Sequence, residues 1–212
     1  MADHAPPGDG SLAEISPGAD LRNRDLASMD LSRRDISGAD LSGASLTGAR
    51  LAEADLTGAH LVRADLGSAT LRDTCLFGAE LAHANLIGAE LQGADLRKAD
   101  LTEATLFRAK LMTTDLRSAT LHRTDLSWAS LIDADLRGAD LRGADLFEAD
   151  LRHADLRGAE LTDAQLDGTE LRGAKVDGRT TWPAGFDHSA LGVEGAADAT
   201  VTEAGPADAG QP

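Results

Sequence analysis

Aromatic and sulfur-containing side chains are scarce in this chain of 212 residues, which contains no tyrosine, four phenylalanines, two tryptophans and one cysteine. The single cysteine, Cys75, rules out an internal disulfide and is consistent with a reducing compartment. The sequence also lacks a long apolar run, so it predicts neither a secretory leader nor a membrane-spanning helix. We therefore expect a cytoplasmic protein that does not associate with a membrane.

Positive charge is limited as well: 20 lysines and arginines stand against 36 aspartates and glutamates, which gives a net charge of −16. This sign argues against direct nucleic-acid binding, because such binding depends on neutralising phosphates. No histidine lies in a recognisable nucleophile or metal motif, and the carboxylates recur periodically instead of converging on one pocket. We therefore expect a protein that is not an enzyme, with no catalytic residue, no metal site and no cofactor.

What the sequence does contain is a leucine at every fifth position from Leu21 to Leu171, with Ile36 as a replacement and Val176 at the end. Alanine usually stands two residues before each leucine, and a short polar residue, most often aspartate, stands directly before it. A helix would spread these leucines around its circumference, because five residues advance a helix by about 140° beyond one full turn. A straight strand would place successive alanines on opposite faces, because five is odd.

Each unit of five residues is therefore predicted to be a short extended side followed by a corner, with glycine or a polar residue in the turn. Repeated corners wind the chain into a closed coil that holds leucine and alanine inside and turns the other three residues outward. One coil cannot bury its own leucines, so the coils must stack through ladder hydrogen bonds spaced about 4.8 Å apart. The sequence therefore predicts an all-β solenoid that forms a single domain.

The number of sides per coil stays open on the residues alone. Arginines that recur in every fourth unit favour four units per turn, as in Arg97, Arg117, Arg137 and Arg157. Arginines that recur in every third unit favour three, as in Arg142, Arg157 and Arg172. The run of Ala-Asp-Leu-x-x units resembles the pentapeptide-repeat family, and it covers residues 19–178 without an insertion. That resemblance implies a right-handed quadrilateral β-helix of about eight coils, each built from four pentads.

The segments on either side of the repeat are assigned from their composition. Residues 1–18 are predicted to hold a disordered N-terminus followed by an N-terminal cap. Residues 188–212 are rich in small and acidic residues with few large apolar ones, and they are predicted to be a disordered acidic tail. A solenoid stem with two polar extensions is the expected organisation.

Both ends of such a stem need a cap, because an open coil exposes ladder edges and core. Leu12 and Ile15 are expected to plug the N-terminal opening. Residues 179–187 are expected to form the C-terminal cap, with Trp182 and Phe186 lying over the last leucines. The segment Thr-Trp-Pro-Ala-Gly-Phe within this range also resembles the closing motif of many pentapeptide-repeat chains.

Aspartates form the first candidate surface for a partner. With four units per turn, four of them fall into one column: Asp95, Asp115, Asp135 and Asp155. Three more lie on successive sides near the C-terminal end: Asp140, Asp145 and Asp150. An adjacent column of arginines is expected to pair with the first set and to cancel much of its field. The competing interpretation is an ordinary solvated face, on which the aspartate before each leucine serves the turn.

Apolar residues that point outward form the second candidate surface. Four of them lie on one face of the predicted coil: Ile87, Phe107, Trp128 and Phe147. Exposed apolar patches often mark partner or dimer surfaces. The competing interpretation is that outward residues near a corner shield the backbone locally.

These observations favour a non-catalytic protein whose rigid rod presents columns of side chains to a protein partner. A second interpretation is a purely structural role, in which the rod is a stable spacer for the two tails. A third, binding through the aspartates, is described in the next paragraph. The three differ in which part of the chain carries binding: the outward apolar residues, the aspartates or the tails.

The family resemblance implies the remaining alternative. Some members resemble DNA, bind DNA gyrase (a type II topoisomerase) and give resistance to quinolones or other gyrase poisons. Several of those members have aromatic central residues and loops that interrupt the coil, whereas this chain has leucine centres and an uninterrupted register. They also form homodimers through C-terminal apolar elements, for which this chain offers Trp182, Phe186, Leu191 and Val193.

Overall fold

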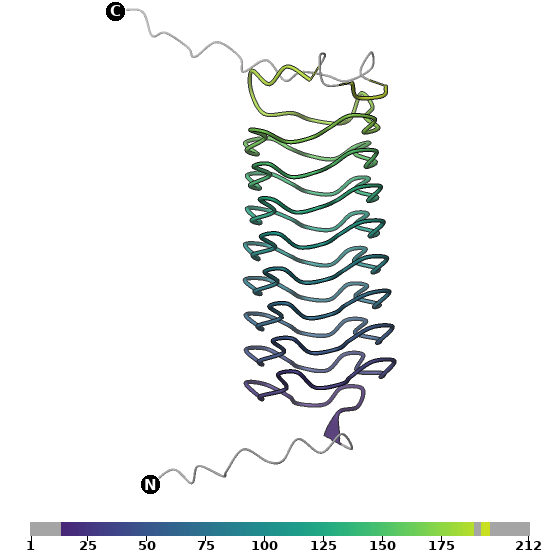
Figure 1. Ribbon diagram of the computed structural model, residues 1–212, viewed down its shortest axis with the longest axis vertical. Coiled ribbons are helices and arrows are strands. Elements are labelled where there is room, and N and C mark those ends of the chain that lie inside the picture. The colour runs from purple at the N-terminus through teal and green to yellow at the C-terminus, as the bar shows by residue number, and fades with distance from the viewer. Residues whose placement is uncertain (1–13, 189–191, 196–212) are drawn as a thin grey trace, which may run out of the picture.

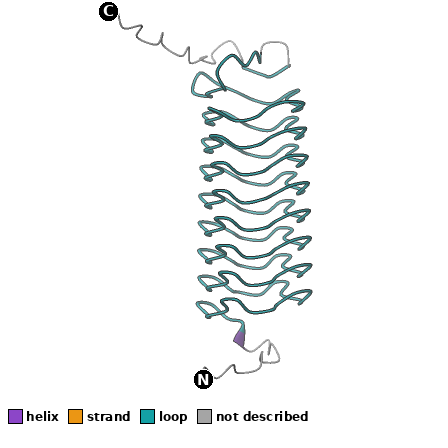
Figure 2. Cartoon of the chain, turned by 90° about the vertical axis from the view of Figure 1, so that its left-hand side faces the viewer, coloured by secondary structure: helices purple, strands orange, loops and turns teal. Residues whose placement is uncertain are grey.

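The computed structural model describes residues 14–188 and 192–195. Over these ranges the chain winds into a rod in which each turn stacks on the one before (Figure 1). The described residues contain no α-helix and no strand longer than a single bridge residue, and only Glu14 belongs to a 3₁₀ turn (Figure 2). The predictions of disorder for the first residues and for most of the tail lie outside the described residues.

Each pentad contributes one bridge residue, the residue directly before the leucine, and this residue pairs in parallel with its counterpart four pentads later. Asp35, for example, pairs with Asp55, and the same column continues through Cys75 to Lys175. Because one turn of the coil takes four pentads, the coil has four sides, and the three-sided alternative is wrong. The sides are single bridges instead of longer strands because two residues of every five are used by the corner.

The backbone amides of a pentad explain the aspartate that precedes half of the leucines in the repeat. In the unit around Leu41, three amides donate to the neighbouring turns and the alanine amide donates to the leucine carbonyl, which closes the corner. The amide directly after the leucine has no backbone acceptor among the described residues; instead, Ser42 N donates to Asp40 Oδ1 over 3.0 Å. The aspartate therefore satisfies the one amide that the coil leaves over.

The second corner residue has a left-handed backbone in every pentad from Gly18 to Gly173. Glycine adopts such angles without steric cost, which explains why it recurs at this position. Trp128 occupies one of these positions with a φ of 59°. Its side chain therefore leaves the coil at a corner.

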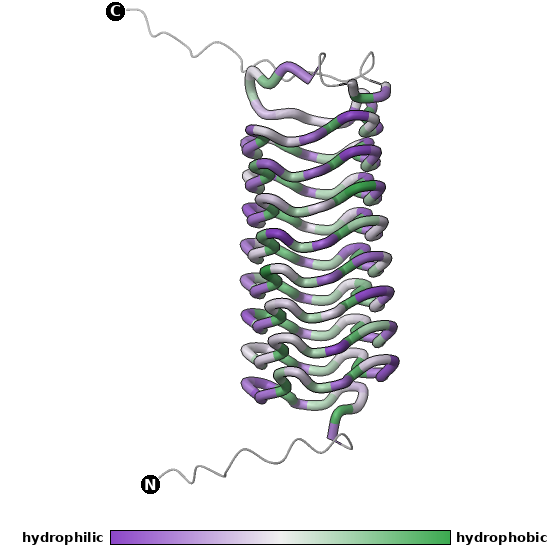
Figure 3. Tube along the Cα trace, in the orientation of Figure 1, coloured by the Kyte–Doolittle hydropathy of each residue, from purple (hydrophilic) through white to green (hydrophobic). Residues whose placement is uncertain are grey.

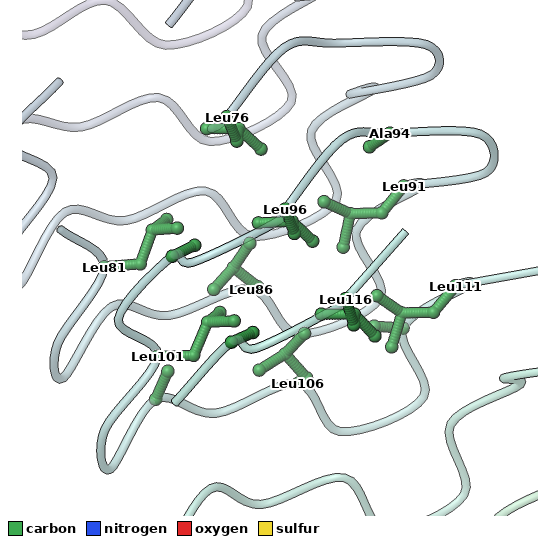
Figure 4. Packing of buried hydrophobic residues seen from close by; sticks show 14 of the residues in the cluster. Leu76, Leu81, Leu86, Leu91, Ala94, Leu96, Leu101, Leu106, Leu111 and Leu116 are labelled. Atoms are coloured by element: carbon green, nitrogen blue, oxygen red, sulfur yellow. The ribbon is translucent and has the colours of Figure 1, made fainter. Parts of the chain in front are cut away.

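Leucine and alanine fill the interior in columns that run along the rod. Figure 4 shows Leu76, Leu96 and Leu116 at the same place in three successive turns, and all three are buried. Hydrophobic and hydrophilic segments alternate within each turn (Figure 3). Where threonine replaces the inward alanine, its hydroxyl bonds to the backbone: Thr114 Oγ1 donates to the Leu91 carbonyl over 2.8 Å.

The N-terminal end is closed by Ile15, which is 4% exposed and belongs to the core. In the first turn, larger residues stand where later turns have alanine. Arg24 reaches back to Glu14, with 3.1 Å between Nη2 and Oε2, and Met29 packs against the core. Leu12, the other residue expected in this plug, lies outside the described range.

The C-terminal end is closed by a turn with one extra residue. Glu160 pairs with Thr181, one position beyond the usual interval of four pentads, so Trp182 occupies the place of the next leucine above Leu161. Trp182 is 2% exposed. Its ring stacks on those of Phe186 and His188, with centroid distances of 5.4 and 5.0 Å.

The end of the rod lies further along the chain than the sequence analysis placed it. His188 is buried, and Glu194 pairs with Lys175 as part of a partial last coil. A tail beginning at residue 188 is therefore wrong for His188 and for residues 192–195. The two cap aromatics and Val193 pack against their own rod, while Leu191 lies outside the described residues.

Candidate interaction surfaces

The column of aspartates and the column of arginines form one continuous ion-paired surface, the Asp–Arg face. Its members are Asp95, Asp115, Asp135 and Asp155 with Arg97, Arg117, Arg137 and Arg157. Arg97 donates to both oxygens of Asp95, over 2.7 and 2.6 Å, and its Nε lies 3.6 Å from Asp115 in the next turn. Each aspartate also accepts a bond from the backbone amide of its own arginine. The negative charge on this face is therefore neutralised locally.

The group of three aspartates near the C-terminal end is only partly paired. Arg142 donates to Asp140 and Arg152 donates to Asp150, each over 2.6 Å. Asp145 accepts the amide of Phe147 over 2.9 Å and has no ion pair with any described residue. These three aspartates therefore contribute one unpaired carboxylate, and not the broad acidic surface that a DNA mimic needs.

Arginine neighbours hold the pKa values of several carboxyls on these surfaces below their ordinary range. Hydrogen bonds from Arg97, Arg142 and Arg152 lower the pKa values of Asp95, Asp140 and Asp150, and burial opposes the shift in each case. Because the pKa is lower in the folded state, these groups stabilise the fold above their unfolded pKa, and the stabilisation is lost as the pH falls through the folded pKa.

We expect the free energy of unfolding to show no loss between pH 7 and pH 5 and to fall below about pH 4. The measurement is urea denaturation at a series of pH values. Changing Asp95, Asp140 and Asp150 together to Asn removes the titrating groups but keeps an acceptor for the corner amide, as Asn85 does for Ile87. This variant should lose less stability in acid, and an acid loss equal to that of the wild type would contradict the assignment.

Four outward apolar residues form the apolar ridge: Ile87, Phe107, Trp128 and Phe147. Successive turns hold them in register, because Gly88 N donates to the carbonyl of Phe107 and Trp128 N to that of Phe147. The rings of Trp128 and Phe147 meet edge to face, with centroids 6.0 Å apart. Ile87, Trp128 and Phe147 are 44, 48 and 41% exposed. The structure therefore places the four predicted residues along one side of the rod, with Phe107 half-buried and the other three exposed.

Two of the shallow hollows on the rod lie along the arginine column. One, of about 500 Å³, lies beside Arg137, Arg157 and Arg179, and another, of about 420 Å³, lies beside Phe77 and Arg97. Over the described residues, no group of three or more histidine, cysteine, aspartate or glutamate side chains is placed to hold a metal ion. Cys75 is half-buried, with its sulfur 3.1 Å from the Thr57 hydroxyl.

No helix in the described part of the chain is long and apolar enough to cross a bilayer.

A four-sided coil of tandem five-residue units, filled with leucine and alanine, defines a class of repeat solenoids. The sequence matches the family described as pentapeptide repeats in eight copies, over residues 18–51, 35–73, 74–112, 109–146 and 144–178. The chain therefore belongs to the pentapeptide-repeat family, whose members form right-handed quadrilateral β-helices.

Two solved structures with this fold are similar to the chain. HetL, a pentapeptide repeat protein involved in heterocyst differentiation regulation from the cyanobacterium Nostoc sp. strain PCC 7120, is 36% identical, covers 74% of this chain and 83% of its own, and has a TM-score of 0.56. A trypsin-treated form of QnrB1, a plasmid-mediated fluoroquinolone resistance protein, is 27% identical, covers 76% and 84%, and has a TM-score of 0.68. No curated protein matches the chain.

Proposed function

We propose that this chain is a non-catalytic scaffold that works in the cytoplasm and binds another protein through the outside of a rigid rod. The apolar ridge is the observation that carries this proposal, because it exposes Ile87, Trp128 and Phe147 on a molecule whose leucines are buried. Exposed aromatic side chains are enriched at protein interfaces. Membership of a family of generally non-enzymatic interaction proteins supports the same function.

Capture of proteins from a cell extract on the immobilised chain tests which surface binds. Changing Trp128 to Ala or Phe107 to Ser should reduce capture of the specific partners at least about tenfold, as expected for an aromatic residue at the centre of an interface. Asn at positions 135, 140 and 155 together is the matched control and should leave capture unchanged. Equal capture by all variants, with loss only on deletion of residues 196–212, which leaves the last coil intact, would instead support the spacer interpretation.

The alternative is a DNA mimic that binds DNA gyrase and protects it from quinolones or other gyrase poisons. Similarity to QnrB1, a fluoroquinolone resistance protein, supports this alternative, as does the column of aspartates. The arginines that pair with Asp95, Asp115 and Asp135 weigh against it, since paired charges produce a weak external field.

A supercoiling assay with purified bacterial gyrase, with and without a fluoroquinolone, separates the two functions. On the scaffold proposal, supercoiling and drug-induced cleavage stay unchanged at roughly tens of micromolar of this protein. Inhibition at low-micromolar protein that weakens with salt, and that is lost when Asp135, Asp140 and Asp155 become Asn, would make the DNA mimic the leading function. The Asn variants keep the corner hydrogen bond but remove the negative charge and one of the two bonds from the paired arginine.

A further inference from the structure

We propose that the apolar ridge is covered by the same ridge of a second copy of this chain, with the two rods antiparallel. This inference rests on the proposed function, in which the ridge is an interaction surface, and it names the occupant. The occupant is indicated by the charges around the ridge, which become complementary when one copy is turned end for end.

Charge changes sign along the ridge from one turn to the next. The turn that contains Trp128 carries no charged residue from 127 to 132. One turn toward the N-terminus, the same positions hold Arg108 and Lys110; one turn toward the C-terminus, they hold Glu148, Asp150 and Arg152. Lys110 pairs with Ser130, which in turn pairs with Asp150, so these positions form one column. Arg152 donates to Asp150 within its own turn, which leaves Glu148 as the unpaired acid there. The net charge of these six positions is therefore positive, zero and negative in three successive turns.

A twofold axis can relate two such rods if it lies in the contact plane, perpendicular to both rods and level with Trp128. This axis keeps each column opposite itself and exchanges the turn before Trp128 with the turn after it. Phe107 then faces Phe147 of the second copy, and Arg108 faces its Glu148. Lys110 faces Asp150 of the second copy in the same way, and the two Trp128 side chains meet at the axis.

A parallel pair of rods would not have this complementarity. Its twofold axis would run along the rods and would place each turn opposite the same turn of the second copy. Arg108 and Lys110 would then approach the same two cations, and Glu148 and Asp150 would approach the same two carboxylates. Like charges across an interface are strongly unfavourable, so the charge pattern selects the antiparallel arrangement.

The two residues at the centre of this argument are free to pair with another molecule. Arg108 lies over the ring of Phe107, with 5.0 Å from its Cζ to the ring centroid, and it makes no ion pair with a described residue. Glu148 likewise has no ion pair within the described ranges, and its carboxylate lies over Gly168, where there is no side chain. Lys110 already contacts Glu90 over 2.8 Å, so the test is built on the first pair.

Three described C-terminal apolar residues, Trp182, Phe186 and Val193, do not compete for the role of dimer contact. Trp182 is enclosed in its own rod, and Phe186 and Val193 pack against the same core. The exposed large apolar residues among those described are Ile87, Trp128 and Phe147, all on the ridge.

Sedimentation velocity of the purified full chain, from about 1 to 200 μM, tests the proposal. The wild type should show a concentration-dependent dimer, and Trp128→Ala should weaken it. Arg108→Glu alone places two acids opposite each other at both symmetry-related contacts, and Glu148→Arg alone does the same with two bases. Each single change should raise the dimer Kd by at least about tenfold.

Mixing the two single variants is the decisive step. In a mixed pair, the glutamate introduced at position 108 of one copy faces the arginine introduced at position 148 of the other. The second contact keeps the native pair of Arg108 and Glu148, so the mixture should form a one-to-one dimer that neither variant forms alone. Matched controls are Arg63→Glu and Asp163→Arg, which reverse charge at the same corner position elsewhere on the rod and should not change the dimer.

Three results would overturn the proposal. A monomer throughout the concentration range excludes the second copy as occupant, and it leaves the scaffold proposal to the capture experiment, which needs no dimer. A dimer weakened by Trp128→Ala but not by either charge reversal keeps the ridge as an interface and excludes the antiparallel register. A dimer insensitive to Trp128→Ala places the contact elsewhere on the chain.

Discussion

Leu96→Ala is expected to lower the free energy of unfolding by about 2–5 kcal/mol. The side chain of Leu96 is fully buried between the leucines of the turns above and below it. The hydrogen bonds between turns fix the spacing of the backbone, so the neighbouring side chains cannot move in to fill the cavity. Little of the lost stabilisation is therefore recovered. Urea denaturation followed by circular dichroism measures the change.

Val62→Ala is the matched control for this prediction. It removes apolar atoms from an outward position that is only half-buried, so we expect a change below about 1 kcal/mol. Equal effects of the two substitutions would show that the central leucines are not the main source of stability.

Trp182→Ala is expected to cost about 3–5 kcal/mol, because it removes the side chain that closes the last turn. Trp182 takes the place of a leucine above Leu161 and stacks on the rings of Phe186 and His188. Its removal leaves the C-terminal ladder edge and the core below it open to water.

The position of the loss distinguishes a cap from an ordinary core residue. Hydrogen exchange should become faster first in the last turns, and the turns near Ile15 should keep their protection. Trp128→Ala removes the same kind of side chain from a site that is 48% exposed, and it should change stability by less than about 1 kcal/mol. Uniform loss of protection along the rod would contradict the cap.

Most of the coil could be predicted because a strict period of five leaves few geometries. The inward leucines and the column from Asp35 to Lys175 both follow from that period and four units per turn. The number of sides could not be derived from the arginines, because outward residues such as Arg142 and Arg157 are not constrained by the coil. The backbone bridges decide it.

The last turn was only partly predictable. Trp182 and Phe186 were predicted to lie at the end of the rod, and the structure places them there. The extra residue before Thr181 and the return of Val193 to the core were not predicted. The sequence does not indicate either feature, because both lie beyond the last leucine of the five-residue repeat.

The candidate surfaces show the same division. The grouping of Phe107, Trp128 and Phe147 follows from the repeat. The role of the aspartates depends on the backbone geometry, because only the hydrogen bonds of all five amides in a pentad show that the amide after the leucine has no backbone acceptor. Arg108 and Glu148 do not stand out in the sequence, because their column does not repeat one kind of residue. Opposite charges two turns apart in one column are the signal that finds them.

The division of each pentad into inward and outward positions has a consequence for comparing members of this family. Two residues of every five are dictated by the interior, so unrelated rods must share a large part of their sequence simply by being rods. Identities of 36% to HetL and 27% to QnrB1 fall within what a common interior requires. Similarity of function among these proteins is therefore to be judged from the three outward positions of each pentad, compared turn by turn and side by side.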